Sequence, residues 1–323
     1  MPSGRLASDP WLLPICVSRV LLYAIFMVYA ACLPVLRSEW GMSATQAGSI
    51  AGGFMFGYAI SLVVFSWLAE RFGAKRMFLF SAWVGAVSAL AFGLFARSYY
   101  SGLLLYTLTA ATQGGTYPPA LMLLADRYDS ARRGGAVGLL IASTSVGYAF
   151  SLLLSGVMLW RGGYQLAFLI MGSLPLVGAV IASWVLRKTP NIVHARPRGS
   201  ALAKVLRRNA NARRLIAGYT FHCWELLGMW QWIPAFLAAS LTLAGILPIQ
   251  AAALAAYLSA TLHIAGAVAS SSMGSLSDQF GRRALLLTLA TTSTTLSFII
   301  GWLIGWPVLA LSFVVLIYGF TTL

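Results

Sequence analysis

Apolar residues along the chain gather into long runs, separated by short stretches that are rich in polar and charged residues. Each run approaches or exceeds the roughly 20 residues that an α-helix needs to cross the hydrocarbon core of a bilayer. The first run is too long for the core of a signal peptide, so we expect it to be a retained helix. The pattern predicts an all-α membrane protein with ten spans, at residues 11–36, 45–68, 77–95, 99–125, 135–160, 164–186, 215–241, 249–277, 284–302 and 307–323.

The overall composition excludes the soluble classes of protein. Of the 323 residues, 59% are hydrophobic and 9% are charged, whereas a soluble domain is about 45–50% apolar and about 25% charged. So few charged side chains cannot cover the surface of a water-soluble globule. The chain is therefore expected to be neither a soluble enzyme nor a disordered segment.

The net charge of +15 is distributed unevenly along the chain. Eighteen of the 22 Lys and Arg residues precede the first run or lie in loops on the same side of the membrane, and three lie on the other side, namely Arg37, Arg97 and Arg161. Positive residues of membrane proteins concentrate in cytoplasmic loops. We therefore predict a multi-pass protein of the plasma (inner) membrane with a cytoplasmic N-terminus, and we do not expect nucleic acid as a partner.

The longest loop divides the chain into two parts. Residues 187–214 contain nine basic residues and two prolines and follow the sixth apolar run. We predict a six-helix bundle over residues 1–186, a basic cytoplasmic loop over residues 187–214, and a second bundle over residues 215–323 that contains helices 7 to 10.

A short motif occurs at corresponding places in these two parts. The loop after the second run reads Ser-Trp-Leu-Ala-Glu-Arg-Phe-Gly-Ala-Lys-Arg over residues 66–76, and the loop after the eighth run reads Gly-Ser-Leu-Ser-Asp-Gln-Phe-Gly-Arg-Arg over residues 274–283. The acid, the Phe-Gly pair and the trailing basic residues recur at an offset of 208 residues. Repeats of this kind are typical of duplicated transporters.

The repeated loop resembles the loop motif of the major facilitator superfamily, Gly-x-Leu-Ala-Asp-Arg-x-Gly-Arg-Lys. The departures from that motif are Ser66, Glu70, Ala74 and Gln279. The resemblance implies two pseudo-symmetric helical bundles and a latch at their cytoplasmic ends, with Asp278 near the start of the fifth helix. A loop that only sets the topology is the alternative. The gating residues that the resemblance implies are Glu70, Arg71, Gly73, Lys75, Arg132, Arg133, Asp278, Gly281, Arg282 and Arg283.

The number of apolar runs differs from that of this family. The resemblance implies twelve helices, whereas the tenth run reaches the last residue, Leu323. We therefore expect the intact protein to contain two further helices.

Small residues form stripes on the fifth and eighth helices. In the fifth helix, three glycines have the spacing of the family's antiporter motif, although Ser151 and Leu152 stand where that motif has Gly-Pro. Small residues permit the close approach of helices in a membrane. Since the resemblance implies that these two helices meet across the two halves, we expect the stripes to face each other. The packing candidates are Gly138, Gly147, Ser151, Gly156, His263 and Gly266.

Two formal charges lie inside the apolar runs, Arg19 in the first run and Glu225 in the seventh. A charge inside the bilayer is costly and usually faces a cavity or a partner, and the resemblance places both helices beside a central cavity. Snorkelling to the membrane surface is the alternative for Arg19, and a structural hydrogen bond is the alternative for Glu225. His222 and Trp232 share a helix face with Glu225, so His222 is a candidate proton relay.

The fourth helix carries Gln113 and Gly114, but it has Ala110 where the family often has an arginine, so proton coupling must use another group. Glycines and prolines within residues 114–119 interrupt this helix and free backbone groups that need other partners. Gln113 and Tyr117 near the interruption are therefore cavity candidates. The complete set of substrate or coupling candidates is Arg19, Gln113, Tyr117, His222, Glu225 and Trp232.

These features predict a secondary transporter that moves a small solute by alternating access, is coupled to protons and is suited to a small anion or an organic acid. The partial antiporter spacing and the aromatic content leave an efflux antiporter for apolar, drug-like compounds as an alternative. A non-transporting membrane receptor or scaffold is an alternative from another class. We expect the partners to be a small-molecule solute, protons and the lipid bilayer, and we expect the protein to be a monomer.

The sequence offers no catalytic chemistry. It contains no Ser-His-Asp set, no paired carboxylates and no phosphate-binding loop, so no enzyme activity is expected. Cys16, Cys32 and Cys223 fall in apolar runs without the spacing of a metal site. We expect no catalytic residues, no cofactor and no metal.

Overall fold

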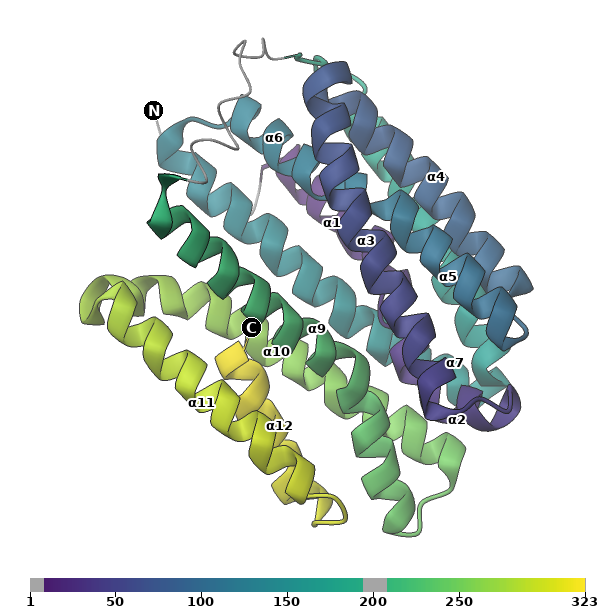
Figure 1. The fold of residues 1–323 in the computed structure, drawn as a ribbon. Coiled ribbons are helices and arrows are strands. Elements are labelled where there is room, and N and C mark those ends of the chain that lie inside the picture. The colour runs from purple at the N-terminus through teal and green to yellow at the C-terminus, as the bar shows by residue number, and fades with distance from the viewer. Residues whose placement is uncertain (1–8, 194–207, 323) are drawn as a thin grey trace.

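The computed structural model describes residues 9–193 and 208–322, and this described part is helical, without a strand (Figure 1). In chain order the elements are α1 (Leu12–Leu22), the 3₁₀-helix η2 (Tyr23–Ile25), α2 (Val28–Glu39), α3 (Ala44–Phe72), α4 (Ala74–Phe95), α5 (Tyr99–Gln113), the 3₁₀-helix η3 (Gly114–Thr116), α6 (Pro118–Arg127), α7 (Ser130–Leu186), α9 (Ala210–Leu243), α10 (Pro248–Phe280), α11 (Arg282–Trp302) and α12 (Val308–Thr322). Each predicted run coincides, to within a few residues, with one helix, with half of α7 or with consecutive helices, which confirms the all-α class.

Seven helical stretches within the described residues are long and apolar enough to cross a membrane by themselves. The three remaining predicted spans have other forms. The long α7 contains two apolar runs, α5 and α6 form one run that η3 interrupts, and α12 is 15 residues long.

The chain reverses inside α7 at Gly163, whose φ of 70° suits glycine because glycine has no Cβ atom. Contacts on the two sides of this residue demonstrate the reversal. Arg19 Nε donates a hydrogen bond to Thr144 Oγ1 at 2.6 Å. The adjacent Ser18 Oγ donates to the Gly178 carbonyl oxygen at 2.8 Å. The two halves of α7 therefore run antiparallel and both pack against α1, as two separate spans.

The first span is broken between α1 and α2, where η2 replaces a regular α-helical turn. A break inside a membrane leaves carbonyl groups without their helical donors, and these groups need other partners. Side chains of α5 and α7 supply the donors. The bonds run from Gln113 Nε2 to the Leu22 carbonyl oxygen (3.1 Å), from Tyr106 Oη to that of Phe26 (2.7 Å) and from Ser151 Oγ to that of Ala24.

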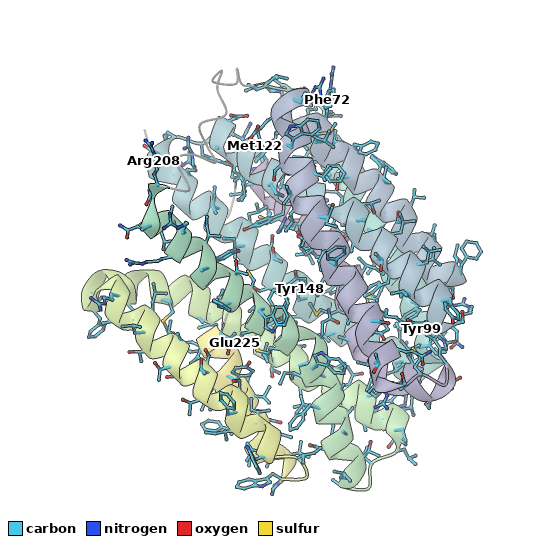
Figure 2. The ribbon with its side chains drawn as sticks, viewed as in Figure 1. Phe72, Tyr99, Met122, Tyr148, Arg208 and Glu225 are labelled. Atoms are coloured by element: carbon cyan, nitrogen blue, oxygen red, sulfur yellow. The ribbon has the colours of Figure 1, made fainter. Side chains whose placement is uncertain are left out.

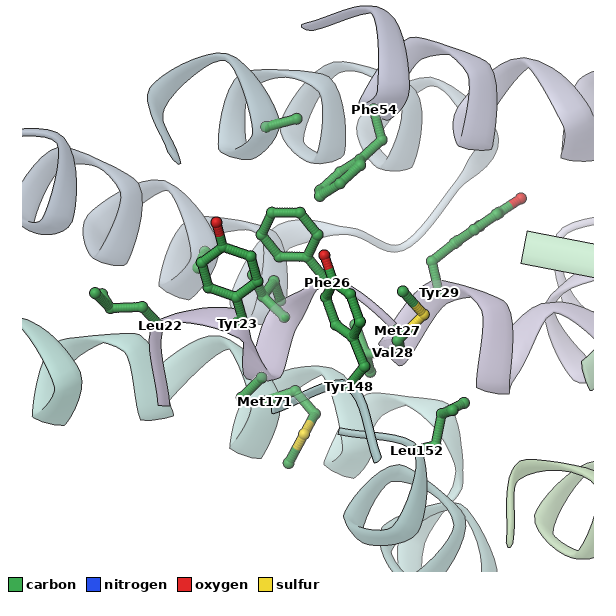
Figure 3. Packing of buried hydrophobic residues seen from close by; sticks show 14 of the residues in the cluster. Leu22, Tyr23, Phe26, Met27, Val28, Tyr29, Phe54, Tyr148, Leu152 and Met171 are labelled. Atoms are coloured by element: carbon green, nitrogen blue, oxygen red, sulfur yellow. The ribbon is translucent and has the colours of Figure 1, made fainter. Parts of the chain in front are cut away.

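Two apolar cores hold the helices together. The larger core lies in residues 9–193, and three alanines of α10 are packed into it. Figure 3 shows a part of this core in which the rings of Tyr23, Phe26 and Tyr148 meet. The smaller core is formed by the helices α9 to α12. Each part of the chain therefore has its own core, and α10 joins the two.

The helices have two ends. The basic end carries the turn at Gly73, together with residues 187–193 and 208–214, and we call the other end the opposite end. Tyr148 and Glu225 lie between the two ends (Figure 2).

The two parts of the chain touch near the opposite end. Gly156 of α7 lies so close to α10 that a Cβ atom in its place would come within 2.6 Å of the Tyr257 ring. Gly48 of α3 lies against the Trp232 ring of α9. Toward the basic end the side chains of α9 are mostly exposed, and Trp224 is 83% exposed. Figure 1 shows that the α3–α4 turn and the α10–α11 turn are well separated. The two parts of the chain are therefore splayed at the basic end.

Candidate functional site

Arg19 on α1 is the one charged side chain among the described residues that is almost fully buried, with 4% of its surface exposed. Its Nε donates to Thr144 Oγ1 at 2.6 Å, and its Nη1 donates to the Thr116 carbonyl oxygen at 3.1 Å. Both partners lie inside the protein, so Arg19 does not snorkel to the membrane surface. The structure therefore favours an internal partner over the snorkelling alternative.

Two tyrosine rings complete the surroundings of the guanidinium group. Arg19 Cζ lies 4.3 Å from the centroid of the Tyr23 ring and 4.8 Å from that of Tyr117, so the negative ring faces stabilise the cation. Among the described residues no carboxylate pairs with Arg19, and its two hydrogen bonds leave further N–H groups available. The site therefore keeps a positive charge that an anion can neutralise.

Tyr23, which lies beside the guanidinium group, also belongs to a larger set of aromatic rings, and Figure 3 shows it near Phe26 and Tyr148. The Tyr23 hydroxyl lies 2.9 Å from the Tyr58 hydroxyl, and the Tyr23 ring centroid lies 5.8 Å from that of Tyr148. Tyr148 in turn makes edge contacts with Trp230 of α9 (4.8 Å) and His263 of α10 (5.4 Å). Two tyrosine rings, those of Tyr23 and Tyr148, therefore link the cation to rings of the second part of the chain.

Tyr23 and Tyr148 are not among the site candidates that the sequence predicts. Tyr23 follows Arg19 by four residues, and Tyr148 follows Thr144 by four. Each of these two tyrosines therefore shares a helix face with a residue of the site. This spacing of four residues is the feature of the sequence that could have identified them. The contact of Trp230 depends on how α9 packs against α7, which the spacing does not determine.

The two candidates near the interruption of the fourth helix have different surroundings. The interruption itself is confirmed as η3. Tyr117 lies under Arg19, whereas Gln113 is fully buried and donates to the Leu22 carbonyl oxygen. Gly85 lies so close to Gln113 that a Cβ atom there would be 2.8 Å from Gln113 Cγ. Gln113 therefore supports the broken first span, and Tyr117 belongs to the Arg19 site.

Glu225 on α9 faces the other helices of the second part of the chain. Its Oε2 accepts a hydrogen bond from Ser293 Oγ at 3.4 Å, and Tyr318 of α12 lies near the same carboxylate. Its Oε1 is buried without a hydrogen-bond partner among the described residues. The contacts of Arg19 lie in the first part of the chain instead, so the structure does not bring the two charged candidates together.

His222 and Trp232 have other neighbours in the described structure. His222 is exposed, and its ring centroid lies 6.3 Å from that of Tyr219. Trp232 lies closer to the opposite end, where its ring meets Gly48. Among the described residues, neither side chain makes a hydrogen bond to Glu225, so the relay through His222 stays a prediction.

The first copy of the repeated motif forms a tight turn between α3 and α4. Gly73 adopts φ 92° and ψ 144°, a conformation that glycine reaches without strain. Asn191 lies across the turn, where its Nδ2 donates to the Phe72 carbonyl oxygen at 2.9 Å and its Oδ1 accepts from the Arg76 backbone N at 3.2 Å. A Cβ atom on Gly73 would clash with the amide group of Asn191. The positive φ of residue 73 and the close approach of Asn191 therefore both require glycine at this position.

The charged residues of this turn lie at the surface of the basic end. Lys75 Nζ donates to the Thr189 carbonyl oxygen at 2.7 Å, just after the end of α7. Arg71 Cζ lies 5.7 Å from the centroid of the Trp67 ring, and Glu70 is exposed. Of these predicted gating residues, Lys75 thus joins the turn to the segment that follows α7.

The second copy of the motif, between α10 and α11, has the same backbone conformation but open surroundings. Gly281 adopts φ 85° and ψ 133°, and no atom of the described residues lies within 4 Å of a Cβ atom built on it. Arg283 is exposed. The side chains of Asp278 and Arg282 lie outside the described part, so the latch between Asp278 and the start of α7 stays a prediction.

The start of α7 contains the other two predicted gating residues, Arg132 and Arg133. Asp129 Oδ1 accepts from the Arg132 backbone N at 3.0 Å and so caps the helix. Arg133 Nη2 donates to the Ala125 carbonyl oxygen at 2.9 Å, near the end of α6. Arg132 Cζ lies 5.9 Å from the centroid of the Tyr128 ring. Both arginines therefore take part in the connection between α6 and α7.

Asp9 stabilises the start of α1 at the basic end. Its Oδ1 accepts from the Trp11 backbone N at 2.9 Å, and its Oδ2 accepts from the Tyr128 hydroxyl at 2.8 Å. Burial alone would raise the pKa of Asp9, but these bonds, a further bond from the Leu12 amide and the charge of Arg127 outweigh burial and hold the pKa below its ordinary value of 3.8. Burial and the bond to Asp9 raise the pKa of Tyr128 to about 12.

The stripe of small residues on α7 faces two different neighbours. Gly147 lies against Tyr23, and Ser151 donates to the break in the first span. Gly156 meets Tyr257 of α10, which is not one of the small residues of the expected stripe. Of the remaining packing candidates, His263 contacts Tyr148, Gly266 is buried, and no neighbouring atom lies within 4 Å of a Cβ atom built on Gly138. The stripe therefore packs against α10 only in part.

The donor set around Arg19 suits an anion. Its members are a guanidinium group and neutral hydroxyl groups, and the positive charge of the guanidinium group attracts an anion and repels a metal cation. Within the described residues, no three His, Cys, Asp or Glu side chains are grouped to hold a metal ion, and Cys16, Cys32 and Cys223 are free thiols.

Proteins with similar sequences include named transporters. The chain is 24% identical to the probable sulfoacetate transporter SauU of Cupriavidus necator over 204 residues, which cover 63% of this chain and 46% of that protein. It is 26% identical to the gallate transporter of Pseudomonas putida over 216 residues, which cover 65% of this chain and 48% of that protein. The chain thus spans about half the length of the curated relatives that it matches.

A solved structure and a family model identify the fold. The crystal structure of a bacterial homologue of the human lysosomal transporter Spinster, in an inward-facing and unoccupied conformation, matches with a TM-score of 0.70 at 18% identity and covers 98% of this chain and 73% of that chain. The model described as Major Facilitator Superfamily matches residues 15–323. These findings confirm the predicted fold, and they indicate a transporter family rather than an enzyme family. The chain belongs to the major facilitator superfamily.

Proposed function

We propose that the protein is a secondary active transporter that carries small organic anions by alternating access and is driven by protons. The observation that carries this proposal is Arg19, a buried cation that lies between two tyrosine rings without a carboxylate partner among the described residues. A charge this deep in a membrane protein is costly unless a partner neutralises it. An anionic substrate supplies that partner.

The geometry of the donors suits a carboxylate or a sulfonate. A guanidinium group is planar and presents paired N–H groups to two oxygen atoms of an acid. Thr144 and Thr116 hold two of the nitrogen atoms of Arg19 from inside the first part of the chain, and other N–H groups remain for a ligand. Sulfoacetate and gallate, which give two relatives their names, both carry an acid group of this kind.

The position of Arg19 agrees with alternating access. Arg19 is linked through the tyrosine rings to Trp230 and His263 of the second part of the chain. The Arg19 site therefore lies close to the contact between the two parts. Transporters of this type rock two halves around a site near the middle of the membrane and expose it to each side in turn. An anion bound at Arg19 then occupies the site around which the two halves rock.

Glu225 supports the coupling to protons. It is the acid within the predicted spans, and the hydroxyl group of Ser293 donates a hydrogen bond to its carboxylate. A carboxylate only accepts hydrogen bonds, whereas a protonated carboxyl also donates one. Loading a proton therefore changes the bond between α9 and α11, which gives the second part of the chain two states.

Uptake measurements on the full-length protein in proteoliposomes test the anion site. The substrates are a panel of labelled carboxylates and sulfonates that includes sulfoacetate and gallate. We expect Arg19→Ala to reduce uptake at least tenfold and Arg19→Lys to reduce it less, because lysine keeps the charge without the planar pair of donors. Arg97→Ala removes an exposed arginine elsewhere and is the matched control. Full uptake by Arg19→Ala would contradict the proposal and favour efflux of apolar compounds.

An imposed pH gradient tests the proton site. With wild-type protein, the gradient should drive accumulation of the anion above its external concentration. We expect Glu225→Gln to keep exchange of anion across the membrane but to lose accumulation, because glutamine cannot release a proton. Glu39→Gln, at an exposed position, is the control. Unchanged proton-driven accumulation by Glu225→Gln would make Glu225 a structural residue.

A further inference from the structure

Two buried nitrogen atoms beside the tyrosine rings have no hydrogen-bond partner among the described residues. They are Trp230 Nε1 and His263 Nδ1. His263 is 2% exposed, and the centroids of the two rings lie 5.6 Å apart. Leaving a buried polar atom without a partner costs about 1–3 kcal/mol. Two such atoms on adjacent rings offer unused hydrogen-bonding capacity to a ligand group.

The ring contacts place this pair relative to the cation. Tyr148 touches Trp230 and His263 on one side, with centroid distances of 4.8 and 5.4 Å, and on the other side it lies 5.8 Å from Tyr23. Tyr23 is the ring under Arg19. A wall of two tyrosine rings therefore separates the cation on α1 from the two nitrogen atoms on α9 and α10.

The chemistry of the pair defines the group that it binds. An indole N–H only donates, so it requires an acceptor. The Nδ1 atom of a neutral imidazole either donates or accepts, depending on the tautomer. A hydroxyl group accepts from Trp230 and serves either tautomer of His263. The pair is therefore complementary to a hydroxyl group.

We propose that Trp230 and His263 bind a hydroxyl group at the end of the substrate that is remote from its acid, and that the substrate is a hydroxylated aromatic acid. The rings of Tyr23 and Tyr148, which are tilted by 47° to each other, supply aromatic surface for the ring of such a substrate. This inference rests on the proposed function, since Arg19 holds the acid. A substrate bound in this way bridges the two parts of the chain.

Binding to the full-length protein in lipid nanodiscs tests the inference. The probes are two pairs of acids that differ in length, benzoate with 4-hydroxybenzoate and cinnamate with 4-hydroxycinnamate. In at least one pair the hydroxylated acid should bind about tenfold more tightly, which corresponds to about 1.4 kcal/mol. We expect His263→Phe and Trp230→Phe each to bring this ratio close to one. His263→Asn should retain part of it, because the asparagine amide can replace Nδ1.

Control variants and thermal unfolding separate binding from folding. Trp302→Phe changes a tryptophan that is 85% exposed and should leave the ratio unchanged. If the wild type binds both acids of each pair equally and Arg19→Ala still loses binding, the hydroxyl site is overturned and the proposed function stands. A water molecule would then occupy the position between Trp230 and His263. Binding of all four acids that does not depend on Arg19 would overturn the proposed function and this inference together.

Discussion

The two copies of the repeated turn have the same backbone and opposite surroundings. Gly73 and Gly281 adopt φ values of 92° and 85° and ψ values of 144° and 133°. Asn191 covers the first turn with two hydrogen bonds to its backbone, whereas no atom of the described residues lies within 4 Å of a Cβ atom built on the glycine of the second turn. The repeated motif therefore determines the shape of the turn, and the neighbouring chain determines how tightly the turn is held.

The source of the difference is the segment that follows α7. Residues 187–193 run across the α3–α4 turn and present carbonyl groups to Lys75 as well as the amide of Asn191. At the same end of the molecule, Asp9 and Tyr128 tie α1 to the connection between α6 and α7. The first part of the chain is thus closed at its basic end by several local bonds.

Alanine substitutions at the two glycines provide the strongest test of this comparison. Gly281→Ala should cost about 1–3 kcal/mol, because alanine is strained at this positive φ. Gly73→Ala should cost about 1–3 kcal/mol more, because it also displaces Asn191 and breaks two hydrogen bonds of about 0.5–1.5 kcal/mol each. Thermal unfolding of the purified protein in detergent measures both costs. Equal costs would show that Asn191 does not hold the first turn.

Substitution of Asn191 sharpens the same comparison from the other side. Asn191→Ala should destabilise the wild type by about 1–3 kcal/mol through loss of its two backbone bonds. In the Gly73→Ala background the same change should cost almost nothing, because those bonds are already broken. A double-mutant cycle of unfolding free energies measures this coupling. Additive effects would mean that the two residues act independently.

Substitution of Asp9 tests the bonds that close the rest of the basic end. Asp9→Ala should lower the free energy of unfolding by about 1 kcal/mol at neutral pH, because the start of α1 loses its acceptor. The pKa of Asp9 is lowered in the folded protein, so its contribution is present above the ordinary value of 3.8 and is lost as the pH falls through the lowered pKa. Unfolding curves of both proteins between pH 7 and acid pH check this. A difference that grows on acidification would refute the assignment.

The smallest expected effect concerns the basic residues of the two turns. Lys75→Met should destabilise the protein by about 0.3–1 kcal/mol, because Lys75 binds carbonyl groups at the C-terminus of α7. Arg283→Met at the exposed second turn should stay within about 0.5 kcal/mol of the wild type. Paired unfolding measurements at low and high salt distinguish the two, since salt weakens exposed interactions. A larger effect at Arg283 would reverse the comparison.

Hydrophobic runs and glycine positions predict much of the fold. The ten runs lie where the helices lie, because length and apolarity suffice to define a span. The interruption after Gln113 follows from its glycines and prolines, and the turn glycines at 73 and 281 have the positive φ that the motif implies. These features are local, so the sequence contains the information that they need.

The partners of the site residues are harder to predict, because they depend on the rotation of apolar helices. A helix that is apolar on all sides does not reveal which face meets which neighbour. Glu225 thus turns toward Ser293 and Tyr318 rather than toward Arg19. For the same reason the contact between Tyr148 and Trp230, which joins distant segments, appears only in the folded structure.

The break in the first span has a mechanical consequence. A continuous helix resists bending, because tilting it strains its own hydrogen bonds. Between α1 and α2 the side chains of Gln113, Tyr106 and Ser151 hold the carbonyl groups, so this stiffness is absent. Arg19 lies on one side of this compliant joint, and the contacts of α2 with α9 and α10 lie on the other. The helix α2 can therefore move together with the second part of the chain while Arg19 on α1 keeps its position.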